Sequence, residues 1–335
     1  MKFIYTFYIF LVSVSISKVF SQDTFSIVAA DSTTREVGSA GASCLDLFAA
    51  GFSDASFIGD LIPNRGAINT QAFYIKENQD NARARMLLGE TPSQIIGWLV
   101  KHDAGNNFTL RQYGIAGFNG SQVSAAGFTG SSAQAYKEHR TGSINGIHYA
   151  IQGNILKGKE VIDSMESRFR NAQGDIACRL MAAMQGANMV GADSRCTPDG
   201  TSSLFAYVKV AKPTDVYGSP YLKVSVRTPD NSQIEPIDSL QVLFDLEHSC
   251  AVTGIRLFPQ ATRLSIYPNP ANDFLYLAIE EESIGSTFKI IDAKGGVVKN
   301  GIADAFVTQV EIATLPAGLY FIRIEGGPES KFLKM

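Results

Sequence analysis

The stretch TFSIVAADSTTREVGSAGASC, residues 24–44, decides how the first part of the chain is read. Residues 24–31 are apolar and β-branched, residues 32–36 supply turn-forming and charged side chains, and residues 37–44 are small and apolar. Small side chains on the second segment favour close packing against a neighbouring layer over a solvated face. The stretch therefore predicts strand, turn and strand at the start of a layered domain.

The residues before this stretch predict an export signal. Lys2 precedes an apolar run, residues 3–16, which is too short to span a bilayer and fits the core of a signal peptide. Small side chains near Ser21 predict cleavage before Gln22, and hence export by the Sec route. The alternative is a buried N-terminal strand. No other stretch is long and apolar enough to predict a membrane helix.

The composition sets the class of protein. The chain has 335 residues, enough for two domains. Its 30 glycines, 21 phenylalanines and 12 tyrosines, against a single tryptophan, favour sheets and tight turns over long helical bundles. The net charge of -3 gives no reason to expect nucleic acid or an acidic membrane surface as a partner.

Strands and helices alternate after the opening pair. Apolar residues at helical spacing mark the helices, and Thr91 followed by Pro92 indicates an N-cap and a first turn. The related motifs AGFNG and AGFTG indicate the two arms of a hairpin. The further predicted strands are 66–75, 110–120, 122–130, 146–156, 202–211 and 221–229, and the predicted helices are 78–88, 91–103, 161–169 and 176–184.

This order of elements predicts sheets sandwiched by helices, an α+β fold. The character of the sequence changes around residue 250, where a proline-containing segment leads into short strands separated by turns, which predict a small all-β sandwich. We therefore expect four regions, and their bounds are 1–21 for the signal peptide, 22–249 for the α+β domain, 250–263 for a linker and 264–335 for the all-β domain.

Export places the cysteines in an oxidising compartment. Cys44, Cys178, Cys196 and Cys250 contain no C-x-x-C pair, so a zinc ribbon is not expected. Two disulfides are expected, and four cysteines allow three pairings. We favour Cys178–Cys196, which would staple a polar loop to the helix before it and leave Cys44 with Cys250. The alternative is four buried free thiols.

Four motifs mark the last domain: LSIYPNPANDFLYL at 264–277, IIDAKGGVV at 290–298, LPAGLYFIRIEGG at 315–327 and KFLKM at 331–335. In this order they closely resemble the type IX secretion system C-terminal sorting domain, type A, of Bacteroidetes. The resemblance implies delivery across the outer membrane by the type IX secretion machinery and removal of this domain, followed by release or attachment to the cell surface. The alternative is an ordinary carbohydrate-binding or immunoglobulin-like module.

Five motifs mark the first domain: TFSIVAAD at 24–31, EVGSAGASC at 36–44, NTQAF at 69–73, YAIQGNIL at 149–156 and GADSRC at 191–196. Together they resemble the domain of unknown function 1028 family. The resemblance implies an αββα sandwich of the N-terminal-nucleophile hydrolase type. The chain departs from the family pattern at Cys196, where the family often continues with a second basic residue and a glycine, and in the loop 45–64.

The resemblance gives Thr24 a candidate role. In an N-terminal-nucleophile hydrolase the first residue attacks a carbonyl through its side chain, and its free α-amine is the general base. Thr24 matches the start of the family. Signal peptidase would leave Gln22 and Asp23 before it, and an amide nitrogen is not a base, so this mechanism requires further trimming. The alternative is that Thr24 is an ordinary β-branched strand residue.

Five other polar residues are candidates for the site. Asp193 and Arg195 lie in a glycine-bounded loop, where they would orient a substrate or polarise a carbonyl, or else close the loop as a structural ion pair. Asn69 and Gln71 lie two apart on one predicted strand and so face the same side. They, and Asn154 at a strand-to-helix turn, would donate hydrogen bonds to a developing oxyanion or satisfy a buried layer.

Other chemistry finds little support in the sequence. Gly153, Gly158 and Lys159 fit G-x-x-x-x-G-K, but Glu160 stands where the magnesium-binding hydroxyl belongs, so no nucleotide is expected. The four histidines show no ligand spacing, and no metal or other cofactor is expected. Two functions remain: an exported hydrolase of a peptide, an acylated amine or another small amide, and a non-catalytic secreted binding protein on the same fold. By analogy with such sandwiches, a homo-oligomer is an expectation.

Overall fold

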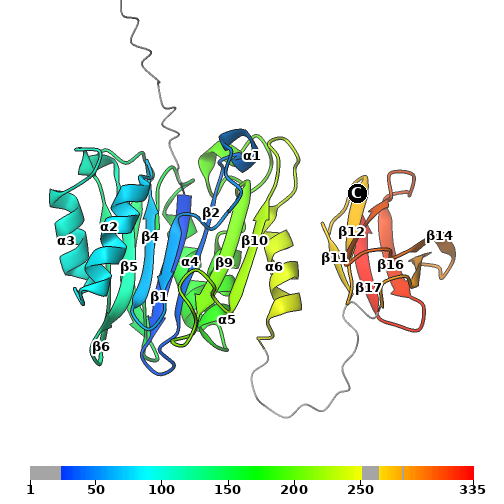
Figure 1. The fold of residues 1–335 in the computed structure, drawn as a ribbon. Helices are drawn as coiled ribbons and strands as arrows, with labels where there is room; N and C mark the ends of the chain where they lie inside the picture. Colours follow the sequence, from blue (N-terminus) through cyan, green and yellow to red (C-terminus); the bar gives the residue numbers. More distant parts are fainter. Residues whose placement is uncertain (1–23, 251–263, 281–282) are drawn as a thin grey trace, which may run out of the picture.

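The structure is a computed structural model that describes residues 24–250, 264–280 and 283–335. The predicted signal peptide, and all of the predicted linker except Cys250, lie outside the described residues. The described residues form a mixed helix-and-sheet domain up to Cys250 and an all-β domain from Leu264, so the predicted α+β and all-β classes are confirmed (Figure 1).

The first domain is built around a six-stranded antiparallel sheet, which we call sheet A. The two strands predicted from residues 24–44 lie at its centre, paired from Thr24↔Ser43 to Ala30↔Val37. The small side chains of the second strand allow a close approach from a helix, since a Cβ added to Gly38 would lie 2.4 Å from the side chain of Leu180. The strand order is β10-β9-β2-β1-β8-β7, and the bounds are β1 Thr24–Asp31, β2 Val37–Ser43, β7 Glu138–Ile144, β8 Ile147–Gly153, β9 Phe205–Ala211 and β10 Leu222–Arg227.

A second antiparallel sheet, sheet B, faces sheet A. The predicted hairpin of AGFNG and AGFTG forms its β5–β6 pair, with Gln112 opposite Thr129. The strand predicted over 66–75 ends at Gln71, because Ala72 and Phe73 take positive φ angles of 56° and 55° that break the extended backbone. The order is β3-β4-β5-β6, and the bounds are β3 Gly59–Ile62, β4 Gly66–Gln71, β5 Gln112–Asn119 and β6 Gln122–Thr129.

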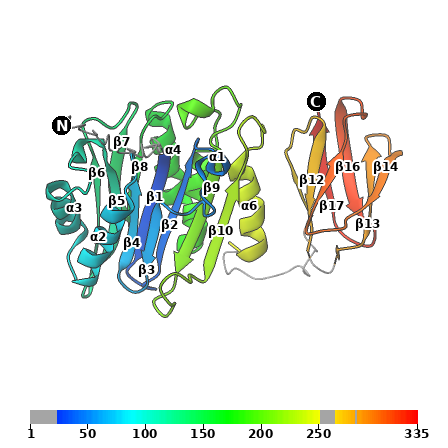
Figure 2. The ribbon, with the colours of Figure 1, turned by 45° about the horizontal axis from the view of Figure 1, so that its top comes forward.

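Helices cover the outer face of each sheet, which gives the layer order helix, sheet, sheet, helix (Figures 1 and 2). On sheet B the apolar faces of two helices pack on Ile68, Tyr113 and Ile115. On sheet A three helices pack on the face directed away from sheet B: two cover β1, β2, β9 and β10, and the third covers β7 and β8. The α-helices are α1 Leu47–Ala50, α2 Lys76–Leu87, α3 Pro92–Lys101, α4 Lys159–Asn171, α5 Ile176–Gly186 and α6 Pro236–Glu247, and the 3₁₀ turns are η1 Phe108–Leu110 and η2 Ser194–Cys196.

Local signals in the sequence explain where several helices start. Thr91 and Gln94 form a capping box at the start of α3, with Pro92 in the first turn as predicted. Several elements were not predicted: α1 and β3, which lie in the expected loop 45–64, and also β7 and α6. β7 has a polar sequence, EHRTGSI, in which every second residue is exposed, and so it lacks the apolar run of a buried strand. α6 begins at a Glu235 cap and Pro236, a start signal that the sequence reading passed over.

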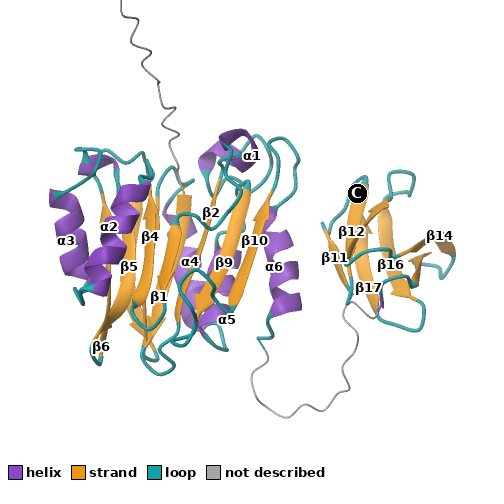
Figure 3. Ribbon diagram, viewed as in Figure 1, coloured by secondary structure: helices purple, strands orange, loops and turns teal. Residues whose placement is uncertain are grey.

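The C-terminal domain is a sandwich of two antiparallel sheets, drawn as strands and loops in Figure 3. Its core contains Leu275, Leu277, Ile290, Ile322 and Phe332, all almost fully buried. One sheet has the order β11-β12-β15 and the other β14-β13-β16-β17, and the bounds are β11 Ser265–Tyr267, β12 Phe274–Ala278, β13 Thr287–Asp292, β14 Val297–Ile302, β15 Val307–Glu311, β16 Gly318–Ile324 and β17 Glu329–Lys334.

All four cysteines form disulfides, but the favoured pairing is wrong. The bonds are Cys44–Cys196 and Cys178–Cys250, with Cα–Cα distances of 5.6 Å and 5.5 Å. Cys178 lies in the first turn of α5, and from there the rest of the helix, to Gly186, carries the chain about 12 Å along the helix axis before Cys196 is reached. The helix therefore separates Cys178 from Cys196. Each bonds instead to a cysteine more distant in sequence.

In the residues that the structure describes, none of the helices combines the length and the apolar character needed to cross a membrane.

Candidate functional site

Thr24 is the first residue of β1 and is fully buried between the two sheets. Its backbone N–H donates to Asn154 Oδ1 at 3.1 Å, and its carbonyl accepts from the Asn154 N–H at 3.1 Å. The same carbonyl accepts from Gln71 Nε2 at 2.9 Å, across from sheet B. Thr24 is therefore held by one residue from each sheet, both of which the sequence predicted for the site.

Strained backbone flanks these two holding residues. Ile155, directly after Asn154, has a φ of 51°, a left-handed conformation that is unusual for a β-branched side chain. Ala72 and Phe73, directly after Gln71, also have positive φ angles. Such conformations cost about 1–3 kcal/mol each and cluster at functional sites. The positive-φ residues therefore mark the end of the sheets where Thr24 lies as the candidate site.

The predicted Asp193–Arg195 pair lies at the same end. Asp193 caps η2 and is fully buried, and its carboxylate accepts from Arg195 Nε at 3.0 Å and from Arg195 Nη2 at 2.7 Å. It also accepts from the Cys44 N–H at 2.9 Å. Arg195 Nη2 in turn donates to Ser43 Oγ at 3.3 Å, and Ser43 is the strand partner of Thr24. The ion pair is thus attached to the β1–β2 pair.

We call this group the Thr24 cluster; its members come from β1, β2, β4, the end of β8 and η2, and they are Thr24, Ser43, Gln71, Asn154, Asp193 and Arg195. The structure brings together all but one of the residues predicted for the site. Asn69 faces the same side of β4 as Gln71, as predicted, but it lies deeper between the sheets. It accepts from Ser39 Oγ at 2.6 Å and donates to the Ile27 carbonyl at 3.2 Å.

Sequence reasoning missed the polar chain beneath Thr24. Gln152 Nε2 donates to Ser26 Oγ at 2.6 Å, and Ser26 Oγ donates to Gln71 Oε1 at 2.5 Å. Gln71 Nε2 also donates to Gln112 Oε1 at 2.6 Å. These buried side chains fix the amide of Gln71 that holds Thr24. Alternation along the strands was the available signal, because Ser26, Gln112 and Gln152 take inward positions in otherwise apolar strands.

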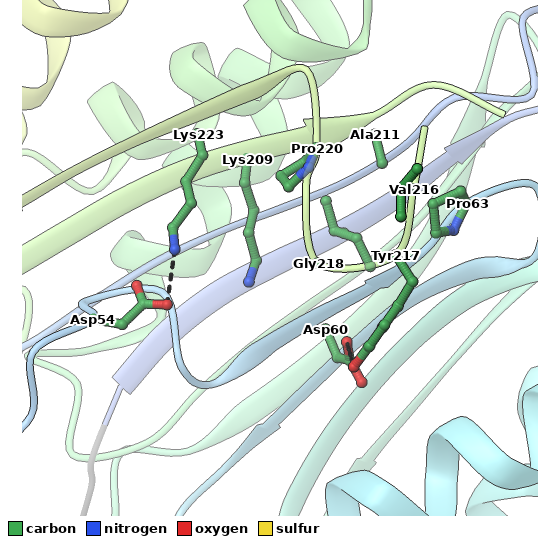
Figure 4. Close-up of a pocket in the computed structure, with 11 residues that line it drawn as sticks. Asp54, Asp60, Pro63, Lys209, Ala211, Val216, Tyr217, Gly218, Pro220 and Lys223 are labelled. Atoms are coloured by element: carbon green, nitrogen blue, oxygen red, sulfur yellow. Dashed lines mark hydrogen bonds and ion pairs between the residues drawn. The ribbon is translucent and has the colours of Figure 1, made fainter. Parts of the chain in front are cut away.

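A second group of charged residues, which we call the Lys209 cluster, lies at a cavity of about 140 Å³ farther along the same face of sheet A (Figure 4). Its members are Asp54, Asp60, Arg83, Lys209 and Lys223, of which Asp60 and Lys209 are buried. Lys209 Nζ donates to the Ser56 carbonyl at 3.0 Å and to the Gly59 carbonyl at 2.8 Å. Burial lowers the pKa of Lys209 to about 8. The other charged members, Asp54 with Lys223 and Asp60 with Arg83, form ion pairs at 2.8 Å and 2.6 Å.

The Lys209 cluster is separate from the Thr24 cluster. Lys209 pairs with Ser39 of β2, four residues along that strand from Ser43. Figure 4 shows Lys209 and Lys223 side by side and directed into the cavity, where Tyr217 donates to Asp60 at 3.1 Å. Lys209 thus donates to backbone carbonyls, and the other charged groups of this cluster are paired with one another.

Two tight groups of metal-ligand side chains occur among the described residues: Cys44 with Cys196 and Asp199, and Cys178 with Asp175 and His248. Every cysteine in these groups is disulfide-bonded, so its sulfur is not a thiolate. Neither group therefore offers the thiolate ligands that a zinc or iron site uses.

Two face-to-face sheets between helices, with a strand-end cluster on β1, and a separate all-β sandwich define an α+β domain followed by an accessory domain. Family models identify both. Residues 24–238 match the family of unknown function DUF1028, and residues 265–335 match the secretion system C-terminal sorting domain. The chain belongs to the DUF1028 family and carries a type IX sorting domain.

One solved structure has a fold similar to that of the first domain. The crystal structure of protein SPO2555 from Silicibacter pomeroyi, described as DUF1028, is 21% identical with a TM-score of 0.50, over 67% of this chain and 88% of that one. At this identity the likeness speaks for the fold alone. PorZ, a surface component of the type IX secretion system of Porphyromonas gingivalis, matches at 18% identity with a TM-score of 0.18, over 22% of this chain and 11% of that one. A search of curated proteins found no match.

The sorting domain fixes the destination of the protein. It is secreted or attached to the cell surface, and its C-terminal domain interacts with the type IX secretion machinery on the way.

Proposed function

We propose that this secreted protein hydrolyses amides, with Thr24 as an N-terminal nucleophile after the residues before it are removed. The observation that carries the proposal is the set of hydrogen bonds that fixes the backbone of Thr24. Its nitrogen donates to Asn154 Oδ1, and its carbonyl is fixed by Asn154 and Gln71. A residue fixed in this way keeps its position when the peptide bond before it is cut.

The chemistry follows from a free α-amine on Thr24. Asn154 Oδ1 would accept one N–H of that amine and leave its lone pair for the threonine hydroxyl proton. The hydroxyl oxygen attacks the amide carbon, the C–N bond breaks, and the amine leaves with the proton. Water then cleaves the resulting ester. An unperturbed α-amine has a pKa of about 8, which suits a base near neutral pH.

Asp193 and Arg195 would handle the substrate. The buried carboxylate fixes the guanidinium through two hydrogen bonds and so directs a positive charge toward the Ser43 side of the cluster. A charge held there stabilises negative charge on a carbonyl oxygen or binds a carboxylate of the substrate. The substrate class is a peptide, an acylated amine or another small amide.

The test begins with the N-terminus of the secreted protein, read by mass spectrometry. Protein that starts at Thr24 and protein that starts at Gln22 are then compared against an amide library. We expect turnover only from the form that starts at Thr24. A secreted protein that starts only at Gln22, above all as pyroglutamate, or equal turnover by both forms would contradict the proposal.

A non-catalytic binding protein is the second candidate, and one observation favours it. The hydrogen bonds of Thr24 to Asn154 also suit a chain that continues before Thr24, since an amide N–H donates to Asn154 Oδ1 as well as an amine does. Absence of turnover in both forms, together with saturable binding of a small amide or peptide, would support this reading.

A further inference from the structure

The Cys44–Cys196 disulfide lies between the two halves of the Thr24 cluster. Cys44 directly follows Ser43, the strand partner of Thr24. Cys196 ends η2, the turn that carries Asp193 and Arg195. The bond spans 152 residues of sequence and therefore joins the strand pair to a turn that no short loop would bring to it.

A hydrogen bond and the disulfide join the same two segments. The Cys44 N–H donates to Asp193 Oδ2 at 2.9 Å, while Cys44 Sγ is bonded to Cys196. Asp193 is fully buried, and a buried carboxylate depends on each of its donors. Arg195, on the same turn, donates to it from its backbone N–H, Nε and Nη2, whereas the Cys44 N–H reaches it from the strand side.

We propose that the Cys44–Cys196 disulfide is a positioning element of the Thr24 cluster, which fixes the Asp193–Arg195 pair against the β1–β2 strands and so sets the affinity for substrate. The inference rests on the proposed function. If the turn separates from β2, Asp193 loses the Cys44 N–H and Arg195 loses Ser43 Oγ. The nucleophile remains, because the hydrogen bonds of Thr24 with Asn154 and Gln71 do not pass through the disulfide or its two segments.

The second disulfide provides a matched control. Cys178–Cys250 joins the first turn of α5 to the residues after α6, and neither of its segments belongs to the Thr24 cluster. Removal of either bond frees a long loop. Only removal of Cys44–Cys196 is expected to change the cluster.

The experiment labels Thr24 with an alkyne-tagged β-lactone, in full-length protein that starts at Thr24. The threonine oxygen attacks the lactone carbonyl, the ring C–O bond breaks, an ester forms, and the ring oxygen leaves as an alcohol that carries the proton. Wild type, C44S/C196S and C178S/C250S are compared for maximal labelling rate and for half-saturating concentration. The probe carries a carboxylate, as a ligand for the guanidinium.

We expect C44S/C196S to raise the half-saturating concentration by about 10-fold or more, since a charge-assisted contact is lost, with little change in the maximal rate. C178S/C250S should leave both values close to wild type. A purely stabilising disulfide would not separate the two values in this way. Equal half-saturation in wild type and C44S/C196S would overturn the proposal.

Reversible reduction covers the case in which C44S/C196S does not fold. Dithiothreitol converts the Cys44–Cys196 bond of folded C178S/C250S into two thiols and becomes a cyclic disulfide. We expect weaker labelling after reduction and recovery after reoxidation. In C44S/C196S that does fold, the same treatment should have no effect on labelling. Unchanged labelling of the reduced C178S/C250S protein would overturn the proposal.

A separate readout distinguishes this inference from the proposed function. Failure of the lactone to label wild type above the Thr24→Ala background would contradict the function alone. Hydrogen exchange of the residue 44 amide, which donates to Asp193, still reports the position of the turn. Fast exchange in C44S/C196S, against slow exchange in C178S/C250S, supports the positioning role; slow exchange in both contradicts it.

Discussion

The Thr24 cluster and the Lys209 cluster lie on the same face of the same sheet, yet they are built differently. The Lys209 cluster consists of charges that pair with one another and with backbone carbonyls around a small cavity. The Thr24 cluster is held by neutral amides and one ion pair, and it is flanked by positive-φ residues. The positive-φ residues beside the held end of β1 are therefore what distinguishes the Thr24 cluster from the other buried polar groups.

Substitution of Thr24 gives the sharpest separation of the two clusters. In protein that starts at Thr24, Thr24→Ala should reduce amide turnover by on the order of 10⁴-fold, because the nucleophile is removed. Thr24→Ser should retain part of the turnover, since only the β-methyl is lost. Turnover is measured against the amide library, with thermal unfolding as the check on the fold. Activity that survives Thr24→Ala would place the chemistry elsewhere.

Loss of either disulfide should destabilise the first domain by a similar amount. The bonds span 152 and 72 residues, for which the chain-entropy model gives about 5 and 4.4 kcal/mol, so we expect about 3–5 kcal/mol for each. Urea unfolding of C44S/C196S and C178S/C250S measures this. A large difference between the two variants would show that the effect on the Thr24 cluster cannot be separated from stability.

Lys209→Met should lower stability by about 2 kcal/mol, because the carbonyls of Ser56 and Gly59 lose their buried donor. Labelling of Thr24 by the lactone should not change. Lys223→Met is the matched control on the neighbouring strand, where the side chain is 42% exposed and its ion pair contributes little. Loss of labelling in Lys209→Met would connect two clusters that we describe as separate.

The protonation of Lys209 predicts a smaller, pH-dependent effect. Burial lowers its pKa from 10.5 to about 8, so between these values the unfolded chain binds a proton that the folded chain does not. Stability from this group therefore rises with pH across that window. The difference in the free energy of unfolding between wild type and Lys209→Met should therefore shift in favour of wild type from pH 8 to pH 10. Urea unfolding at both pH values measures this difference. A constant difference would mean that the carbonyls keep Lys209 charged.

Removal of the C-terminal domain should have the smallest effect on either cluster. A shortened protein that ends at Cys250 keeps both disulfides and the core of the first domain. We expect its melting temperature to match that of the first transition of the full chain. Insolubility of the shortened protein, or a lower melting temperature, would contradict independent folding.

Parts of this architecture were predictable from local sequence. Apolar, β-branched and small residues in 24–44 predicted two strands, which the structure places at the centre of sheet A, and the capping residues at Thr91 predicted the start of α3. Other features depend on tertiary contacts. β7 is a polar strand that forms because β8 offers it an edge, which leaves no apolar run to detect.

The residues of the candidate site were predictable only in part. Thr24, Asn154, Asp193 and Arg195 came from motifs, and the structure places them together. The disulfide pairing could not be predicted from motifs, because it depends on where α5 directs the chain. Gln112 and Gln152 were missed because an isolated glutamine in a strand gives no sign of the side chain that it will meet across two sheets.

The Cys178–Cys250 bond also has a mechanical consequence. Cys250 is the last described residue before the segment that leads to the sorting domain, and it is bonded to α5, which packs on the centre of sheet A. Any force applied through the sorting domain would therefore reach α5 through the disulfide. Without that bond the same force would act first on the end of α6, which packs on β9 and β10. The Cys178–Cys250 bond would thereby protect α6 from force applied through the C-terminal sorting domain.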